Sequence, residues 1–161
     1  MKYSVLLDTS FFIRLLNDED KLHKNAKDYF RYFIENDIIL KISTISIAEY
    51  CVVGKLSELP LRNIQIVPFN LEHAKKTGEF ANIIFTANKI AKEKLHPRPI
   101  IPNDSKLFAQ ADLDKDIQYF VTSDKRSTDK TIKALTKEVV PNFKILDINI
   151  SYNQFFGLLD M

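Results

Sequence analysis

Four acidic residues stand where a carboxylate could do chemistry. Asp8 ends an apolar run that begins at residue 3, and Asp124 follows a second apolar run at residues 117–122. Glu49 interrupts the apolar stretch IAEYCVV, and Asp104 follows the proline-rich stretch HPRPIIPN. A buried carboxylate without a partner costs several kcal/mol, and no basic residue adjoins Glu49. The pattern therefore favours a cation shared by Asp8, Glu49, Asp104 and Asp124.

Hard oxygen ligands of this kind suit Mg²⁺ or Mn²⁺. Zinc fits poorly, because the three histidines are scattered along the chain and there is one cysteine. A divalent cation would cancel the repulsion between carboxylates that share a site. Such a cluster can position a water molecule and stabilise charge on a phosphodiester during its hydrolysis. The hydroxyls of Thr9, Ser10 and Ser123 would fix the carboxylates or contact phosphate.

Each acid also has a purely structural explanation. Asp8 and Asp104 could cap helices, since Asp is a favoured residue at a helix start. Asp124 could be an ordinary turn residue, and Glu49 could extend from a helix edge into solvent. These alternatives stay open for each residue taken alone. The four acids together favour the metal site.

The elements that must position these acids alternate between strand and helix. We expect strands at residues 2–7, 38–43, 63–69, 117–122 and 143–148, and helices at 10–16, 22–35, 45–56, 71–92, from 104 onward, at 129–138 and after Ser151. This alternation predicts an α/β fold, a three-layer α/β/α sandwich around a five-stranded, mostly parallel sheet. The strand order 3-2-1-4-5 would make strands one and four neighbours at the switch point where ligands bind. Asp8 and Asp124 would then face the same edge of the sheet.

Composition sets wider limits. The chain has 161 residues, 45% of them hydrophobic, with a net charge of +2 and no internal repeat, so we expect one domain over residues 1–161. A charge so near neutral does not by itself indicate nucleic-acid binding. Cys51 lies in an apolar run and is expected to be a small core residue. There is neither a long apolar segment nor a signal peptide, which predicts a soluble cytoplasmic protein without membrane contact.

Four segments together resemble the PIN domain family: LLDTSFFI (residues 6–13), STISIAEY (43–50), PNDSKLFAQA (102–111) and FVTSD (120–124). The resemblance covers nearly the whole chain and implies the 3-2-1-4-5 fold. It also implies an Mg²⁺- or Mn²⁺-dependent endoribonuclease with Asp8, Glu49, Asp104 and Asp124 as catalytic and metal-binding residues. Many PIN proteins of this size are VapC-like toxins of type II toxin–antitoxin pairs, commonly dimeric, that cleave structured RNA such as tRNA or rRNA. An RNA substrate, an antitoxin partner and a homodimer are therefore expected.

The chain departs from the family pattern in two places. Some members carry a further acid just after the fourth, whereas here Lys125 and Arg126 follow and Asp129 comes next, where it either completes the site or caps a helix. Extra residues lie around 89–102. A non-catalytic PIN-type module that binds RNA or protein is the alternative, although the presence of all four acids argues against it.

The sequence indicates the surfaces that could bind RNA or a protein partner less clearly than it indicates the acidic site. Basic residues beside Asp104 and Asp124 predict RNA contacts at Lys94, Arg98, Lys125 and Arg126, or else mark hydrated helix faces. Aromatic residues cluster at positions 29–33 and 11–12. Most of them are expected in the core, and any surplus would form a dimer face or take up an antitoxin.

Overall fold

The computed structural model describes residues 2–87 and 102–158. Its centre is a five-stranded sheet in the order β3-β2-β1-β4-β5, in which all neighbouring strands are parallel. This confirms the predicted strand order and fold class. The strands are β1 (Ser4–Leu7), β2 (Ile39–Ser43), β3 (Ile64–Val67), β4 (Ile117–Thr122) and β5 (Lys144–Asp147).

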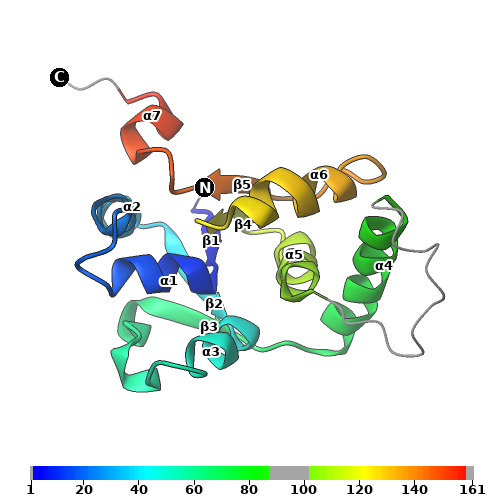
Figure 1. The fold of residues 1–161 in the computed structure, drawn as a ribbon, viewed down its shortest axis with the longest axis horizontal. Coiled ribbons are helices and arrows are strands. Elements are labelled where there is room, and N and C mark those ends of the chain that lie inside the picture. The colour runs from blue at the N-terminus through cyan, green and yellow to red at the C-terminus, as the bar shows by residue number, and fades with distance from the viewer. Residues whose placement is uncertain (1, 88–101, 159–161) are drawn as a thin grey trace.

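Helices cover both faces of this sheet (Figure 1). Alternate residues of β1 point to opposite faces, so Val5 and Leu7 pack on one side and Leu6 on the other. The helices on the first side are α1 (Thr9–Leu15), α2 (His23–Glu35), α3 (Thr44–Tyr50) and α7 (Tyr152–Phe156), and those on the second are α4 (Leu71–Ala87), α5 (Asn103–Leu113) and α6 (Ile132–Leu135). Short 3₁₀ turns occur at η1 (Leu56–Glu58) and η2 (Leu61–Asn63), and a π-helical turn, η4 (Ser127–Thr131), precedes α6.

The core explains why the strands are apolar on both faces. All four residues of β1 are buried, as expected for the central strand of a parallel sheet covered on both sides. On the α5 side, the rings of Phe108, Phe120 and Phe143 pack against one another, with centroids 5.1–6.3 Å apart. These aromatic contacts hold α5, and with it Asp104, against β4.

Two predicted helices have different bounds. The helix expected at residues 45–56 ends at Tyr50, because the Tyr50 carbonyl accepts from Val53 and Gly54 and the chain turns. Cys51 is exposed in that turn, so its assignment to the core was wrong. Helical conformation before α6 begins at Lys125 rather than at Asp129.

The observed bounds of the remaining elements agree more closely with the predicted ones. The helix expected at residues 71–92 is observed over Leu71–Ala87, and its last predicted turn lies outside the described residues. None of the helices within residues 2–87 and 102–158 combines the length and the apolar character that a membrane crossing requires.

Candidate active site

Asp8 lies at the carboxyl end of β1, where it also begins α1. Its Oδ1 accepts from the Thr9 backbone N–H at 2.8 Å, which makes Asp8 the N-cap of α1. Its Oδ2 accepts from the hydroxyls of Ser10 (2.7 Å) and Thr122 (2.9 Å). Thr122 comes from the end of β4, so Asp8 joins the two central strands. Asp8 is thus both the N-cap of α1 and a member of the acidic site.

Asp8 is 6% exposed, and its environment is costly for a negative charge. Burial raises the pKa of Asp8 to about 6, although the hydrogen bonds from Ser10 and Thr122 act in the opposite direction. The charges of Asp104 and Glu49 raise this pKa further. These three carboxylates therefore lie close enough to repel one another.

Asp104 occupies the first turn of α5, with its side chain half-buried. It does not cap α5, because the capping position is Pro102. Burial is the main cause that raises the pKa of Asp104, and the charges of Asp124 and Glu49 add to it. Its Oδ2 accepts from the Thr131 hydroxyl at 3.3 Å. Asp104 is thus the acid that connects Asp124 electrostatically with the other two.

Glu49 reaches the site from the last turn of α3. Its Oε2 accepts from the Thr9 hydroxyl at 2.5 Å, and its Oε1 accepts from Nδ2 of Asn103. The side chain is half-buried and the adjacent Ala48 is exposed, so the surroundings of Glu49 are less apolar than the stretch IAEYCVV suggests. The Glu49 carboxylate therefore accepts hydrogen bonds from two neutral groups, and it does not need a cation to compensate for its burial.

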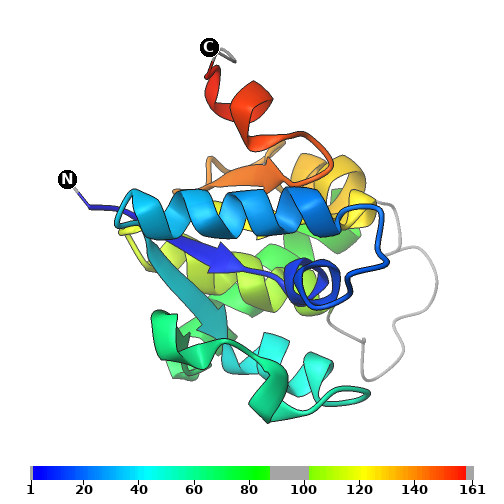
Figure 2. The ribbon, with the colours of Figure 1, turned by 90° about the vertical axis from the view of Figure 1, so that its left-hand side faces the viewer.

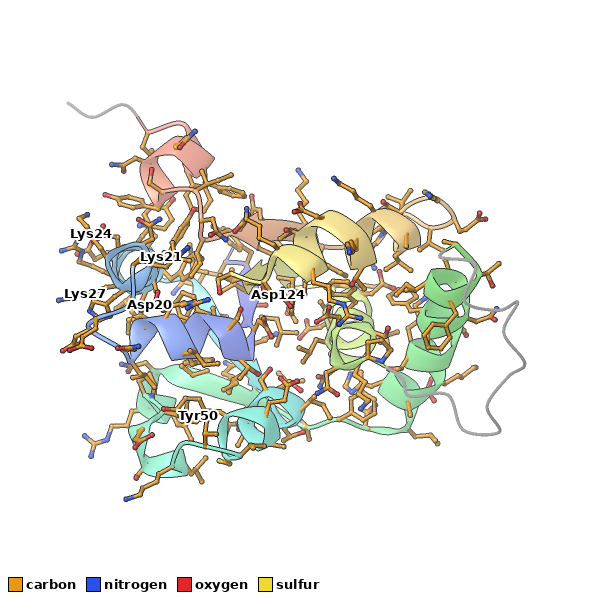
Figure 3. The ribbon with its side chains drawn as sticks, viewed as in Figure 1. Asp20, Lys21, Lys24, Lys27, Tyr50 and Asp124 are labelled. Atoms are coloured by element: carbon orange, nitrogen blue, oxygen red, sulfur yellow. The ribbon has the colours of Figure 1, made fainter. Side chains whose placement is uncertain are left out.

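Asp124 follows β4 and is the labelled acid near the centre of Figure 3. Its Oδ1 accepts from the Arg126 backbone N–H at 2.8 Å, and its own N–H donates to the Thr122 hydroxyl at 3.0 Å. Asp124 therefore begins the helix that leads into η4. Asp129 lies inside η4 and is exposed, so the interpretation of Asp129 as a helix cap was wrong.

The donors of this site fit a hard divalent cation, because they are carboxylate and hydroxyl oxygens. None of the four carboxylates forms an ion pair with a described lysine or arginine. However, among residues 2–87 and 102–158 no three His, Cys, Asp or Glu side chains form a group that could hold a metal. The acids share one electrostatic environment but are not arranged as a finished coordination sphere, since Asp8 and Glu49 are bonded to protein donors.

The predicted RNA contacts are only partly placed. Lys94 and Arg98 lie outside the described residues. Lys125 is exposed, and its Nζ forms an ion pair with Asp147 at 2.8 Å, so its charge is already partly compensated. Arg126 is exposed beside Asp124.

Sequence reasoning missed four residues that contact the site or its ligand side chains. The Thr122 hydroxyl donates to Asp8 and accepts from the Asp124 backbone N–H. Its place as a polar residue at the end of an apolar strand was the sequence signal that could have indicated this role. Asn103 directly precedes Asp104 and binds Glu49, while Lys106 Nζ donates to Asn103 Oδ1 at 2.9 Å. The fourth is Arg14, whose contact with Ser123 depends on tertiary structure and leaves no local signal.

These features define an open α/β protein with an acidic site at the switch point between β1 and β4. The model of the PIN domain matches residues 5–134, and the chain belongs to the PIN domain family. PIN domain nucleases generally depend on divalent metal ions. No significant match was found among curated proteins.

Several solved structures share the fold at low sequence identity. VapBC2 from Rickettsia felis, bound to a promoter DNA fragment, is 19% identical with a TM-score of 0.57, covering 89% of this chain and 98% of that chain. FitAcB from Neisseria gonorrhoeae is 15% identical with a TM-score of 0.56, covering 89% and 97%. VapC20 from Mycobacterium tuberculosis, a sarcin–ricin loop cleaving toxin, is 17% identical with a TM-score of 0.50, covering 77% and 92%.

Proposed function

We propose that this protein is an Mg²⁺- or Mn²⁺-dependent endoribonuclease. The observation that carries the proposal is the electrostatic coupling of four carboxylates that have no described basic partner. Burial raises the pKa of Asp8 and of Asp104, and the charges of neighbouring acids of this set raise both further. A nearby cation would favour the charged forms of these groups. Membership of the PIN family supports the same chemistry.

Under this proposal Asp8, Asp104 and Asp124 hold the metal directly or through water. The bound metal would supply Lewis-acid stabilisation of charge on the scissile phosphate. Glu49 joins the ligands or orients the attacking water, and Thr9 fixes its Oε2. Ser10 holds Asp8, and Ser123 in turn donates its backbone N–H to the Ser10 hydroxyl at 2.9 Å.

We further propose that the protein acts as the toxin of a type II toxin–antitoxin pair. Its structural neighbours include a sarcin–ricin loop cleaving toxin and DNA-bound VapBC complexes. The proposed partners are an antitoxin protein, a second copy of this chain and a structured RNA such as tRNA or rRNA. Such a substrate implies a cytoplasmic location, and we propose that residues 1–161 act as one domain.

One observation favours the alternative, a non-catalytic module that binds RNA or protein. Both carboxylate oxygens of Glu49 are engaged by Thr9 and Asn103, and no metal-binding group of three acids forms within the described ranges. The nuclease therefore requires Glu49 or Asp8 to exchange protein donors for metal or water, whereas the binding module does not.

The distinguishing experiment is cleavage of a structured RNA with Mn²⁺, with Mg²⁺ and with chelator. The nuclease proposal expects metal-dependent cleavage by the natural protein and a loss of at least about 100-fold in Asp8→Asn and Asp104→Asn. Glu19→Gln, on an exposed surface position, is the matched control. RNA binding without cleavage under all metal conditions would favour the module, and cleavage that survives both aspartate substitutions would refute the mechanism.

A further inference from the structure

Arg14 is a cation beside the acidic site that the proposed chemistry does not use. It lies in the last turn of α1, and its guanidinium forms an ion pair with Asp20 through Nη1. Its Nε donates to the Ser123 hydroxyl at 3.4 Å, a long hydrogen bond. Asp20 is itself held in place, because its Oδ1 accepts from the Leu22 backbone N–H at 2.8 Å. The guanidinium is therefore fixed from two sides.

Hydrogen bonds connect this position with the acids. Ser123 directly precedes Asp124, and the Ser123 backbone N–H donates to the Ser10 hydroxyl. The same Ser10 hydroxyl donates to Asp8 at 2.7 Å. Arg14 thus stands at the edge of a site whose carboxylates would otherwise repel the phosphates of a nucleic acid.

The guanidinium has donors left for a ligand. A guanidinium carries five N–H groups, and only two of those of Arg14 contact the described part of the chain, so three remain. The side chain is 34% exposed, so part of it is in contact with solvent. A planar group of this kind can bind a phosphate through two parallel hydrogen bonds.

Exposed lysines follow Arg14 along the chain, in the turn before α2 and in the first turns of α2. Lys21, Lys24 and Lys27 are exposed, and Lys24 pairs with Asp28 at 2.5 Å. Lys21 and Lys27 form no ion pair with another residue of the described ranges. Figure 2 shows α2 antiparallel to β1, with its first turn beside α1 at the carboxyl end of that strand. In the view of Figure 3, Asp20, Lys21, Lys24 and Lys27 all lie on one side of Asp124.

We propose that Arg14, Lys21 and Lys27 form a track for the sugar–phosphate backbone of the RNA, with Arg14 binding the phosphate nearest the acids. The proposal rests on the proposed ribonuclease function, because it assumes that RNA enters this site. Under this proposal the RNA backbone passes along the side of the site where α2 lies.

The test is equilibrium binding of a fluorescein-labelled single-stranded RNA in chelator, measured between 50 and 300 mM salt. On a single strand each phosphate contact contributes about 0.7 to the slope of log K against log salt. Arg14→Gln should lower that slope by about 0.7 and weaken binding about fivefold at 0.1 M salt, and Lys21→Gln with Lys27→Gln should lower the slope by about 1.4. Arg14→Lys keeps the charge and should retain most of the slope.

Arg62→Gln is the matched control, because Arg62 is exposed in η2, at the amino end of β3 and away from the carboxyl edge. Should Arg14→Gln unfold by leaving Asp20 unpaired, the double variant Arg14→Gln/Asp20→Asn removes the ion pair without an uncompensated charge. An unchanged slope and affinity in a folded Arg14 variant would overturn the track. So would an Arg14 substitution that spares RNA binding but abolishes binding of a protein partner.

The two proposals fail separately. Salt-dependent RNA binding that requires Arg14, without any cleavage, would support the track and reject the nuclease. Metal-dependent cleavage with binding indifferent to Arg14, Lys21 and Lys27 would support the nuclease and reject the track.

Discussion

Replacing Asp8 by asparagine should stabilise the protein at pH 8 in the absence of metal, although it removes a proposed ligand. Folding raises the pKa of Asp8 from 3.8 to about 6. The folded state therefore holds this proton more tightly, and stability is highest below pH 3.8, decreases between pH 3.8 and 6, and stays low above that range. A difference of about 2 pKa units corresponds to about 3 kcal/mol.

Asparagine removes that cost but changes the hydrogen bonds. Its Oδ1 can still accept from the Thr9 backbone N–H, whereas its Nδ2 requires the hydroxyls of Ser10 and Thr122 to turn and accept. We therefore expect Asp8→Asn to raise the free energy of unfolding by about 1–3 kcal/mol at pH 8 and by almost nothing at pH 4.

Urea denaturation in chelator at both pH values measures this difference. The exposed Glu19→Gln variant is the control and should show no gain that depends on pH. Saturating Mg²⁺ should then stabilise the natural protein and leave Asp8→Asn unchanged. An Asp8→Asn variant that is less stable than the natural protein at pH 8, or equally altered at both pH values, would refute the burial argument.

Other consequences concern the metal, the positioning of Glu49 and the core. Mg²⁺ or Mn²⁺ at ten times its dissociation constant should stabilise the natural protein by about 1.4 kcal/mol in thermal melting, and Asp104→Asn should abolish this shift; a melting temperature that metal does not move would contradict the shared site. Asn103→Leu removes the donor that occupies Oε1 of Glu49, which metal or water would have to displace, and should strengthen Mn²⁺ binding by up to about fivefold by calorimetry, with Lys106→Met acting in the same direction but less; weaker binding would show instead that Asn103 positions Glu49 for the metal. Phe108→Ala empties a fully buried position and should cost about 3–5 kcal/mol of unfolding free energy without altering metal affinity per folded molecule, and a cost below about 1 kcal/mol would contradict the packing of α5 on β4.

The fold was accessible from the sequence because its signals are local. Apolar runs such as residues 4–7 and 117–122 predict buried strands, and their alternation with amphipathic helices leaves few topologies. Errors occurred at two helix ends, where one local hydrogen-bonding arrangement out of several that the sequence allows sets the boundary. The end of α3 depends on the turn at Tyr50, and the start of the helix after β4 depends on capping by Asp124.

The site was predictable in its acids but not in their partners. Asp8 and Asp124 follow strands, so parallel topology alone brings them to one edge of the sheet. The hydrogen bonds of Glu49 with Thr9 and Asn103 join segments that lie 40 and 54 residues apart, and no sequence period reports them. The same holds for Arg14 and Ser123, which are 109 residues apart.

The most direct test of the shared metal site is anomalous diffraction from crystals of the protein grown with Mn²⁺. The account predicts a manganese peak between the carboxylates of Asp8 and Asp104, at oxygen distances of about 2.1 Å, with Asp124 and Glu49 as direct or water-mediated ligands. A structure in which Mn²⁺ binds elsewhere, or in which these four side chains contact no metal at saturating Mn²⁺, would contradict it.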